Sequence, residues 1–229
     1  MTSKLDDVMA ACMARTEKNR ADAAKRMGVD IDDLDAKMAE DDRFDAAEEA
    51  VRGSGASLTA REVRMVARGP LKESEALYVV RRWMSAKEIE RPILVLCGDV
   101  GVGKTMACAW AISEHGSGKV VHAPTLGRRV LPTRSDRENG FERINLKSSM
   151  LVLDDLGTEP SSDEHRWNEA FAMLIEARMS TGRTIITANM KRKDFASRYD
   201  KRIISRLNAS SYVMELKKTM PMRATGGGL

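Results

Sequence analysis

The sequence contains 229 residues, of which 42% are hydrophobic and 31% charged, enough apolar side chains for the core of one domain with a sizeable appendage. No apolar run approaches the roughly 18 residues of a membrane-spanning helix, and residues 1–7 are polar and acidic, so we expect no membrane span and no secretory signal and place the protein in the cytoplasm. Residues 1–90 carry 16 Lys and Arg against 19 Asp and Glu (net −3), whereas residues 91–229 carry 22 against 15 (net +7), which suggests a polyanionic partner for the second part.

The N-terminal region is predicted to be helical. Residues 1–55 are rich in Ala and charged residues without strand-like alternation, which predicts short helices that end at the flexible residues 53–55. Ala24, Gly28 and Leu34 match the spacing of a helix-turn-helix, but residues 30–35 of its second helix include four aspartates, which DNA phosphates repel. We therefore expect a protein-docking or structural helical unit here.

Two further helices are expected before the first strand. Thr59 and Glu62 have the spacing of a capping box, which predicts a helix through Ala67 that Gly69-Pro70 ends. A longer amphipathic helix is then expected over residues 71–87.

A glycine-rich loop follows the apolar run 93–97 and precedes a helix-compatible stretch. It reads G-x-x-x-x-G-K-T, so backbone N–H groups can face phosphates, Lys104 can reach the β and γ oxygens, and the Thr105 hydroxyl can ligate Mg²⁺. The strand–loop–helix setting predicts a site for ATP and Mg²⁺ and disfavours the alternative of a glycine turn that contains Lys and Thr by chance. The expected nucleotide-binding residues are Gly98, Asp99, Val100, Gly101, Val102, Gly103, Lys104, Thr105 and Met106.

Strand-like and helical stretches alternate along the rest of the chain. Strands are expected at residues 120–123, 150–153, 184–188 and 212–216, and a helix at 167–179. This alternation predicts an α/β fold, a parallel five-stranded sheet between helices. We divide the chain into a helical, partner-binding region at 1–68, a nucleotide-binding core at 69–220 and a disordered tail at 221–229.

Polar residues follow two of the expected strands, at the sheet edge where ligands bind in open α/β folds. Asp154 is placed to hold Mg²⁺ through its waters, and Asp155 to orient or deprotonate an attacking water. Asn189 can hydrogen-bond both the γ-phosphate and that water. The alternatives are that the two aspartates only cap a strand before a turn at Gly157, and that Asn189 is an ordinary turn residue.

The cysteines and histidines predict no further site. Cys12, Cys97 and Cys108 are widely spaced and are expected to be buried thiols. His115, His122 and His165 show no metal-ligand spacing, so each is expected to be structural or exposed.

Basic residues gather in two stretches of the second half. Arg202 and Arg206 are four residues apart, on one face of a predicted helix, and one of them could reach the γ-phosphate of a neighbouring subunit. The stretch 191–206 and the arginines at 128, 129, 134 and 137 can contact DNA phosphates. Because aromatic residues are only 4% of the chain, we expect electrostatic binding without sequence preference. We expect single-stranded DNA as the partner, and double-stranded DNA stays open as the alternative. A solvated basic surface is the alternative for both stretches.

In combination, these motifs resemble those of the DnaC/IstB group of AAA+ ATPases over residues 70–218. The loop 98–105 is similar to a Walker A motif, residues 151–159 to a Walker B strand, and Asn189 to a sensor-1 residue. The resemblance places a trans-acting arginine finger at Arg206, with Arg202 as second choice. It implies a P-loop NTPase of AAA+ type, here without a C-terminal lid, that assembles head to tail.

The same resemblance implies a bacterial helicase loader in DNA replication or a transposition helper that delivers a transposase to target DNA. The partner, helicase or transposase, would bind the N-terminal region. Two other classes stay open: a kinase acting on a small molecule, and an adaptor that binds ATP without hydrolysing it, because Asp155 has a shorter reach than a glutamate.

Overall fold

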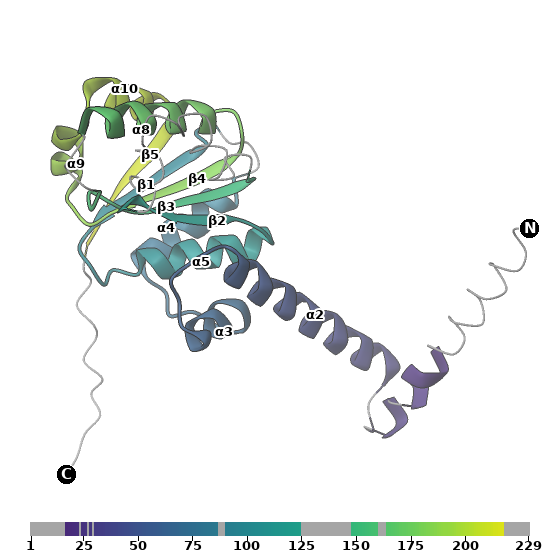
Figure 1. The fold of residues 1–229 in the computed structure, drawn as a ribbon. Coiled ribbons are helices and arrows are strands. Elements are labelled where there is room, and N and C mark those ends of the chain that lie inside the picture. Colours follow the sequence, from purple (N-terminus) through teal and green to yellow (C-terminus); the bar gives the residue numbers. More distant parts are fainter. Residues whose placement is uncertain are drawn as a thin grey trace, which may run out of the picture. The chain divides into compact units, whose positions relative to one another are not determined.

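In the computed structural model, five parallel strands form one sheet in the order β2-β3-β4-β1-β5 (Figure 1). The strands are β1 (Ile93–Gly98), β2 (Lys119–His122), β3 (Met150–Leu156), β4 (Arg183–Ala188) and β5 (Ser211–Leu216). The structure describes residues 17–22, 24–26, 28, 30–86, 90–124, 148–159 and 164–217. The expected α/β fold with a five-stranded parallel sheet is confirmed.

Helices cover both faces of the sheet (Figure 1). Alternate residues of β1 point to opposite faces, as the pleat of a strand requires. Leu94 and Leu96 pack with α4 (Glu75–Met84) and α5 (Lys104–His115). Ile93, Val95 and Cys97 pack on the other face, which is covered by α8 (Glu164–Arg178), α9 (Arg192–Arg198) and α10 (Lys201–Ser210). Burial on both faces explains why the strands are nearly continuous apolar runs.

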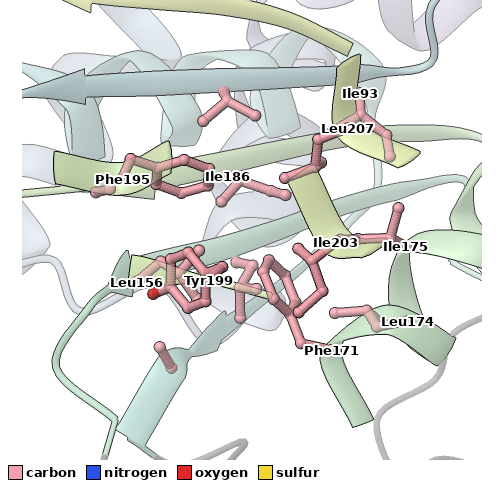
Figure 2. Close-up of a cluster of buried hydrophobic side chains, with 14 of the residues drawn as sticks. Ile93, Leu156, Phe171, Leu174, Ile175, Ile186, Phe195, Tyr199, Ile203 and Leu207 are labelled. Carbon is pink, nitrogen blue, oxygen red and sulfur yellow. The ribbon is translucent and has the colours of Figure 1, made fainter. Parts of the chain in front are cut away.

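The core between the sheet and α8, α9 and α10 contains an aromatic cluster (Figure 2). Phe171 of α8 lies 5.4 Å from Tyr199, and Phe195 of α9 lies 5.1 Å from Tyr199, between ring centroids. Ile203 and Leu207 of α10 are each 1% exposed and complete this side of the core. The cluster fixes the start of α10 against α8 and the sheet.

The chain divides into two compact units, Met1–Ala46 and Ala47–Leu229. Within the first, Ala24 and Leu34 are buried, Gly28 has a φ of 68°, and Arg20 pairs with Asp35. Residues 47–68, including α3 (Ala60–Arg68), pack with the larger unit, where Val63 and Val66 meet Ala109 of α5. The functional boundary at residue 68 stays a prediction.

Two helix predictions need correction. The N-terminal region was expected to hold short helices, but α2 runs without a break from Ile31 to Gly53. Neither Gly nor Pro interrupts these residues before Gly53, so a continuous helix can form without an apolar stripe. The helix expected over 71–87 begins only at Glu75, because the Ser74 hydroxyl accepts a hydrogen bond from Leu77 N–H and caps it, and it ends at Met84.

Other boundaries agree with the sequence. The capping box of Thr59 and Glu62 forms at the start of α3, and Gly69 is its C-cap. Within the described ranges, no helix has the length and apolar character needed to cross a bilayer. The arginines at 128, 129, 134 and 137 and the tail at 221–229 lie outside the described residues.

Candidate nucleotide-binding site

The phosphate-binding loop joins β1 to α5 in a conformation that requires glycine. Gly101 and Gly103 have φ values of 86° and 91°, in the left-handed region that side chains disfavour. Gly98 lies so close to β5 that a Cβ there would be 2.7 Å from the Leu216 carbonyl oxygen. Gly103 is the N-cap of α5 and supplies no side-chain acceptor, so the first N–H groups of the helix suit a phosphate.

Lys104 lies over this loop and is 6% exposed. Its ammonium donates to the carbonyl oxygens of Gly98 and Asp99, both at 2.9 Å, which uses two of its three N–H bonds. Burial lowers the pKa of Lys104, and the negative charges of Asp155 and Asp154 oppose that shift. A triphosphate would supply further negative charge to this buried cation, so the loop fits such a ligand.

Asp154 and Asp155 lie at an irregularity near the end of β3. The pairing of β3 with β4 shifts register between Leu153 and Leu156, and Asp155 has a φ of 58°. Such a bulge re-aims the side chains it contains. Asp154 is 2% exposed, whereas Asp155 is partly exposed. The two neighbouring carboxylates therefore have different surroundings, as their different expected roles require.

Strand β4 lies between β3, which carries the aspartates, and β1, which leads into the phosphate loop. Thr187 donates a 2.6 Å hydrogen bond to Asp154 Oδ1 and accepts one of 3.0 Å from the Asp155 N–H. Asn189 Nδ2 donates to Asp155 Oδ1 at 2.7 Å. The structure thus brings Asp154, Asp155 and Asn189 together beside the loop. Thr187 was missed, although a polar residue within an apolar strand, two positions before Asn189, was a signal for it.

His122, which was expected to be structural or exposed, is partly exposed and ends β2 with its Nδ1 3.7 Å from Asp154 Oδ2. Among the described residues, one atom each from His122, Asp154 and Asp155 lies within 4.8 Å of the others, a geometry that can hold a metal ion. Within this cluster, the carboxylates of Asp154 and Asp155 supply the oxygen ligands that Mg²⁺ prefers. No sequence spacing pairs His122 with Asp154, since only the register of β2 and β3 brings them together.

Glu159 is a second buried acid near the site, with 8% exposure. Its carboxylate accepts hydrogen bonds from Gly157 N–H, Tyr199 Oη and Arg198 Nε. Burial, followed by the charge of Glu159, raises the pKa of the Tyr199 hydroxyl, so it stays a donor. No sequence pattern indicates a contact between Glu159 and Tyr199, which are 40 positions apart.

Arg202 and Arg206 lie on α10 as expected, and Arg202 is exposed whereas Arg206 is partly exposed. Arg206 Nη2 is 3.6 Å from Glu176 Oε2 of α8, with side chains 37% and 67% exposed. The two arginines line an open groove of about 430 Å³ between α8 and α10, together with Asn168, Glu169, Ala172, Met173, Glu176, Asp200 and Ile203. A finger role for either arginine is not tested by this geometry and stays a prediction.

The basic stretch 191–206 spans α9 and α10. Lys191, Arg192 and Lys193 are exposed at the start of α9. Arg198, by contrast, forms an ion pair with Glu159 at 3.2 Å. The start of α9 therefore presents three consecutive exposed basic side chains.

The predicted thiols are buried. Cys97 is fully buried in β1 and Cys108 is 2% exposed in α5, and both are free. Burial raises the pKa of both thiols, that of Cys97 to about 11, so neither is a reactive thiolate at neutral pH. Cys12 and the His165 side chain lie outside the described residues.

Comparisons with known proteins agree with this geometry. Residues 83–206 match the family described as IstB-like ATP binding protein. The structure is similar to that of the DnaC helicase loader, at 24% identity and a TM-score of 0.55 over 69% of this chain and 100% of that chain. DnaI has 25% identity and a TM-score of 0.53 over 65% of this chain and 88% of that chain. The replication initiator DnaA bound to AMPPCP and single-stranded DNA has 15% identity and a TM-score of 0.54 over 70% of this chain and 51% of that chain. No curated protein matches by sequence.

Proposed function

The chain belongs to the family of IstB-like ATP-binding proteins, and from this premise we propose that it hydrolyses ATP as an assembly-dependent AAA+ switch that loads a replicative helicase on DNA. One observation carries the proposal. The phosphate loop, the Asp154–Asp155 pair and Asn189 lie at the carboxyl ends of three adjacent strands, β1, β3 and β4, and so meet at one edge of the sheet. This edge is where open α/β sheets bind nucleotides.

Each residue has a separate task in this proposal. The loop N–H groups and Lys104 bind the β and γ phosphates, and Thr105 and Asp154 would hold Mg²⁺. The metal ion would supply positive charge to the phosphate oxygens. Asp155 positions or deprotonates the water, and its hydrogen bond with Asn189 supports this task by fixing its carboxylate. An arginine of α10, Arg206 or Arg202, acts on the nucleotide of the next subunit.

The partners follow from charge and from the similar structures. DNA would bind through Lys191, Arg192 and Lys193, without sequence preference, because these are phosphate-binding side chains with few aromatic residues among them. The similar DnaA structure contains single-stranded DNA, and the similar DnaC is described as a helicase loader. We therefore favour single-stranded DNA and a replicative helicase, the latter bound by residues 1–68. The family match equally supports a transposition helper with a transposase as partner.

ATP hydrolysis and partner retention test the proposal together. We expect the full chain to release phosphate from ATP and Lys104→Ala to lose this activity, because the substitution removes the buried cation of the loop. Immobilised full chain with ATP should retain purified replicative helicase, whereas Lys104→Ala should not. Retention of a purified transposase in place of the helicase would favour the second function. ATP binding with no phosphate release would instead identify an adaptor.

A further inference from the structure

The carboxylate of Glu159 connects the turn after β3 to the start of α10. Its Oε2 accepts a 2.6 Å hydrogen bond from Gly157 N–H, and its Oε1 accepts one of 2.8 Å from Tyr199 Oη. Arg198 Nε donates to the same Oε1 at 3.2 Å. Glu159 side-chain exposure is 5%, so water cannot easily replace these partners.

The first of these segments carries Asp155. The carbonyl oxygen of Asp155 accepts a 2.6 Å hydrogen bond from Thr158 Oγ1, and Gly157 has a φ of 101°. A Cβ at Gly157 would be 2.2 Å from Met190 Cε, so the turn passes close to the chain that follows β4. Glu159 accepts the hydrogen bond of the Gly157 backbone N–H. This bond therefore helps to set the path of the chain after Asp155.

The second segment carries the two arginines. Tyr199 directly precedes Asp200, whose carboxylate caps α10 by accepting a 2.7 Å hydrogen bond from Arg202 N–H. The ring of Tyr199 lies in the aromatic cluster, and Figure 2 shows it near Leu156 at the end of β3. The Tyr199 hydroxyl is thus the link between a buried acid and the first turn of α10.

We propose that Glu159 is a positioning residue that couples the two segments: it holds the turn of Asp155 and the start of α10 in one geometry, so that a change at either is transmitted to the other. A carboxylate suits this task because both of its oxygens accept hydrogen bonds at once, whereas an amide has one acceptor oxygen. The inference rests on the proposed function, since it assigns to α10 the arginines that act on a neighbouring nucleotide.

Glu159→Gln tests the kinetic consequence. We expect its kcat for ATP hydrolysis to fall about 10-fold while its affinity for a fluorescent ATP analogue changes less than about 2-fold, because the phosphate loop is intact and only the water-orienting turn is displaced. Glu215→Gln is the matched control. Glu215 also accepts a backbone N–H, that of Arg192, but it is exposed and does not contact the turn. Its kcat should equal that of the wild type.

Amide hydrogen exchange tests the coupling itself. In Glu159→Gln, exchange should accelerate about 5-fold in both segments, residues 155–158 and 200–206. Tyr199→Phe removes only the hydroxyl, and should accelerate exchange in 200–206 as strongly while leaving the Glu159–Gly157 bond in place. This second variant keeps the test decisive if Glu159→Gln fails to fold.

The outcomes separate this inference from the proposed function. If the wild type does not hydrolyse ATP, the proposed function fails, but faster exchange in both segments still supports the coupling. If exchange in 200–206 is unchanged in both variants, Glu159 does not couple the segments and the inference is overturned. Equal losses of nucleotide affinity and kcat in Glu159→Gln would likewise overturn it, since they indicate general unfolding of the site.

Discussion

Asp155 combines an unusual backbone with an accessible side chain. Its φ of 58° is a conformation that Asp and Asn tolerate better than most residues, and its Oδ1 is fixed by Asn189 at 2.7 Å. The buried Asp154 is instead held by Thr187 at 2.6 Å. These surroundings fit the roles proposed above, in which Asp154 would hold metal-bound water and Asp155 would act on the attacking water.

Asp155→Asn should therefore separate binding from hydrolysis. Asn keeps the backbone conformation and the acceptor for Asn189 but loses the basic carboxylate, so we expect kcat to fall about 100-fold with nucleotide affinity nearly unchanged. Steady-state phosphate release and an equilibrium titration with an ATP analogue measure the two effects. Asp154→Ala is the comparison, and an equal loss of affinity in both variants would show that the roles are wrongly assigned.

The sequence predicts those site residues whose spacing is itself the signal. The loop 98–105, the Asp154–Asp155 pair and Asn189 each follow an apolar run that becomes a strand, and the structure brings them to one edge. His122 and Glu159 could not be predicted in this way. Their partners, Asp154 and Tyr199, are 32 and 40 positions away, and only strand register and core packing determine these contacts.

At the scale of elements, the strands were the most predictable parts and their order the least. Each of the five expected strands forms, because an apolar run of this length is stable when helices bury both of its faces. That β4 lies between β1 and β3 is a property of packing, which no local pattern contains. For α2 the prediction was wrong in another way: its polar sequence lacks an apolar stripe, so we expected short helices where one continuous helix forms.

A fully buried arginine joins three elements at the opposite end of the sheet. Arg178, at the C-terminus of α8, donates to Thr184 Oγ1 of β4 at 2.7 Å, to the Ser148 carbonyl oxygen before β3 at 2.7 Å, and to the Arg183 carbonyl oxygen at 2.8 Å. Burial lowers its pKa, but an arginine remains charged at neutral pH. Its guanidinium therefore connects α8 to β4 and to the segment before β3 through three hydrogen bonds.

Arg178→Met should destabilise the fold without changing the nucleotide site. Methionine fills much of the volume but leaves three acceptors without these donors, so we expect the free energy of unfolding to fall by about 3 kcal/mol, as measured by urea denaturation. Arg178→Lys keeps the positive charge but loses the forked N–H donors of the guanidinium. Its free energy of unfolding should therefore lie between those of the wild type and Arg178→Met. A change below about 0.5 kcal/mol in Arg178→Met would contradict this role.

For the whole molecule, the decisive question is whether the active site is shared between subunits. Arg206 is placed by an ion pair with Glu176 of α8 and is 37% exposed, while Lys104 is buried in the phosphate loop. An exposed ion pair contributes at most about 1 kcal/mol to stability, so Arg206 can exchange Glu176 for a phosphate at low cost. Its placement on the surface of α10 fits a residue that acts on another copy of the chain.

Arg206→Ala should bind ATP almost normally and lose hydrolysis, and the wild-type activity should rise with protein concentration. Mixing Arg206→Ala with Lys104→Ala should restore part of the activity, because at a mixed interface the first supplies an intact phosphate loop and the second an intact arginine. Phosphate release from the mixture measures this complementation. Arg202→Ala mixed with Lys104→Ala is the parallel test of the second arginine. If the Arg206 mixture stays inactive while ATP and DNA still drive assembly in sedimentation, Arg206 is not the trans-acting residue. If Arg202→Ala loses activity and mixing with Lys104→Ala restores it, Arg202 has that role instead.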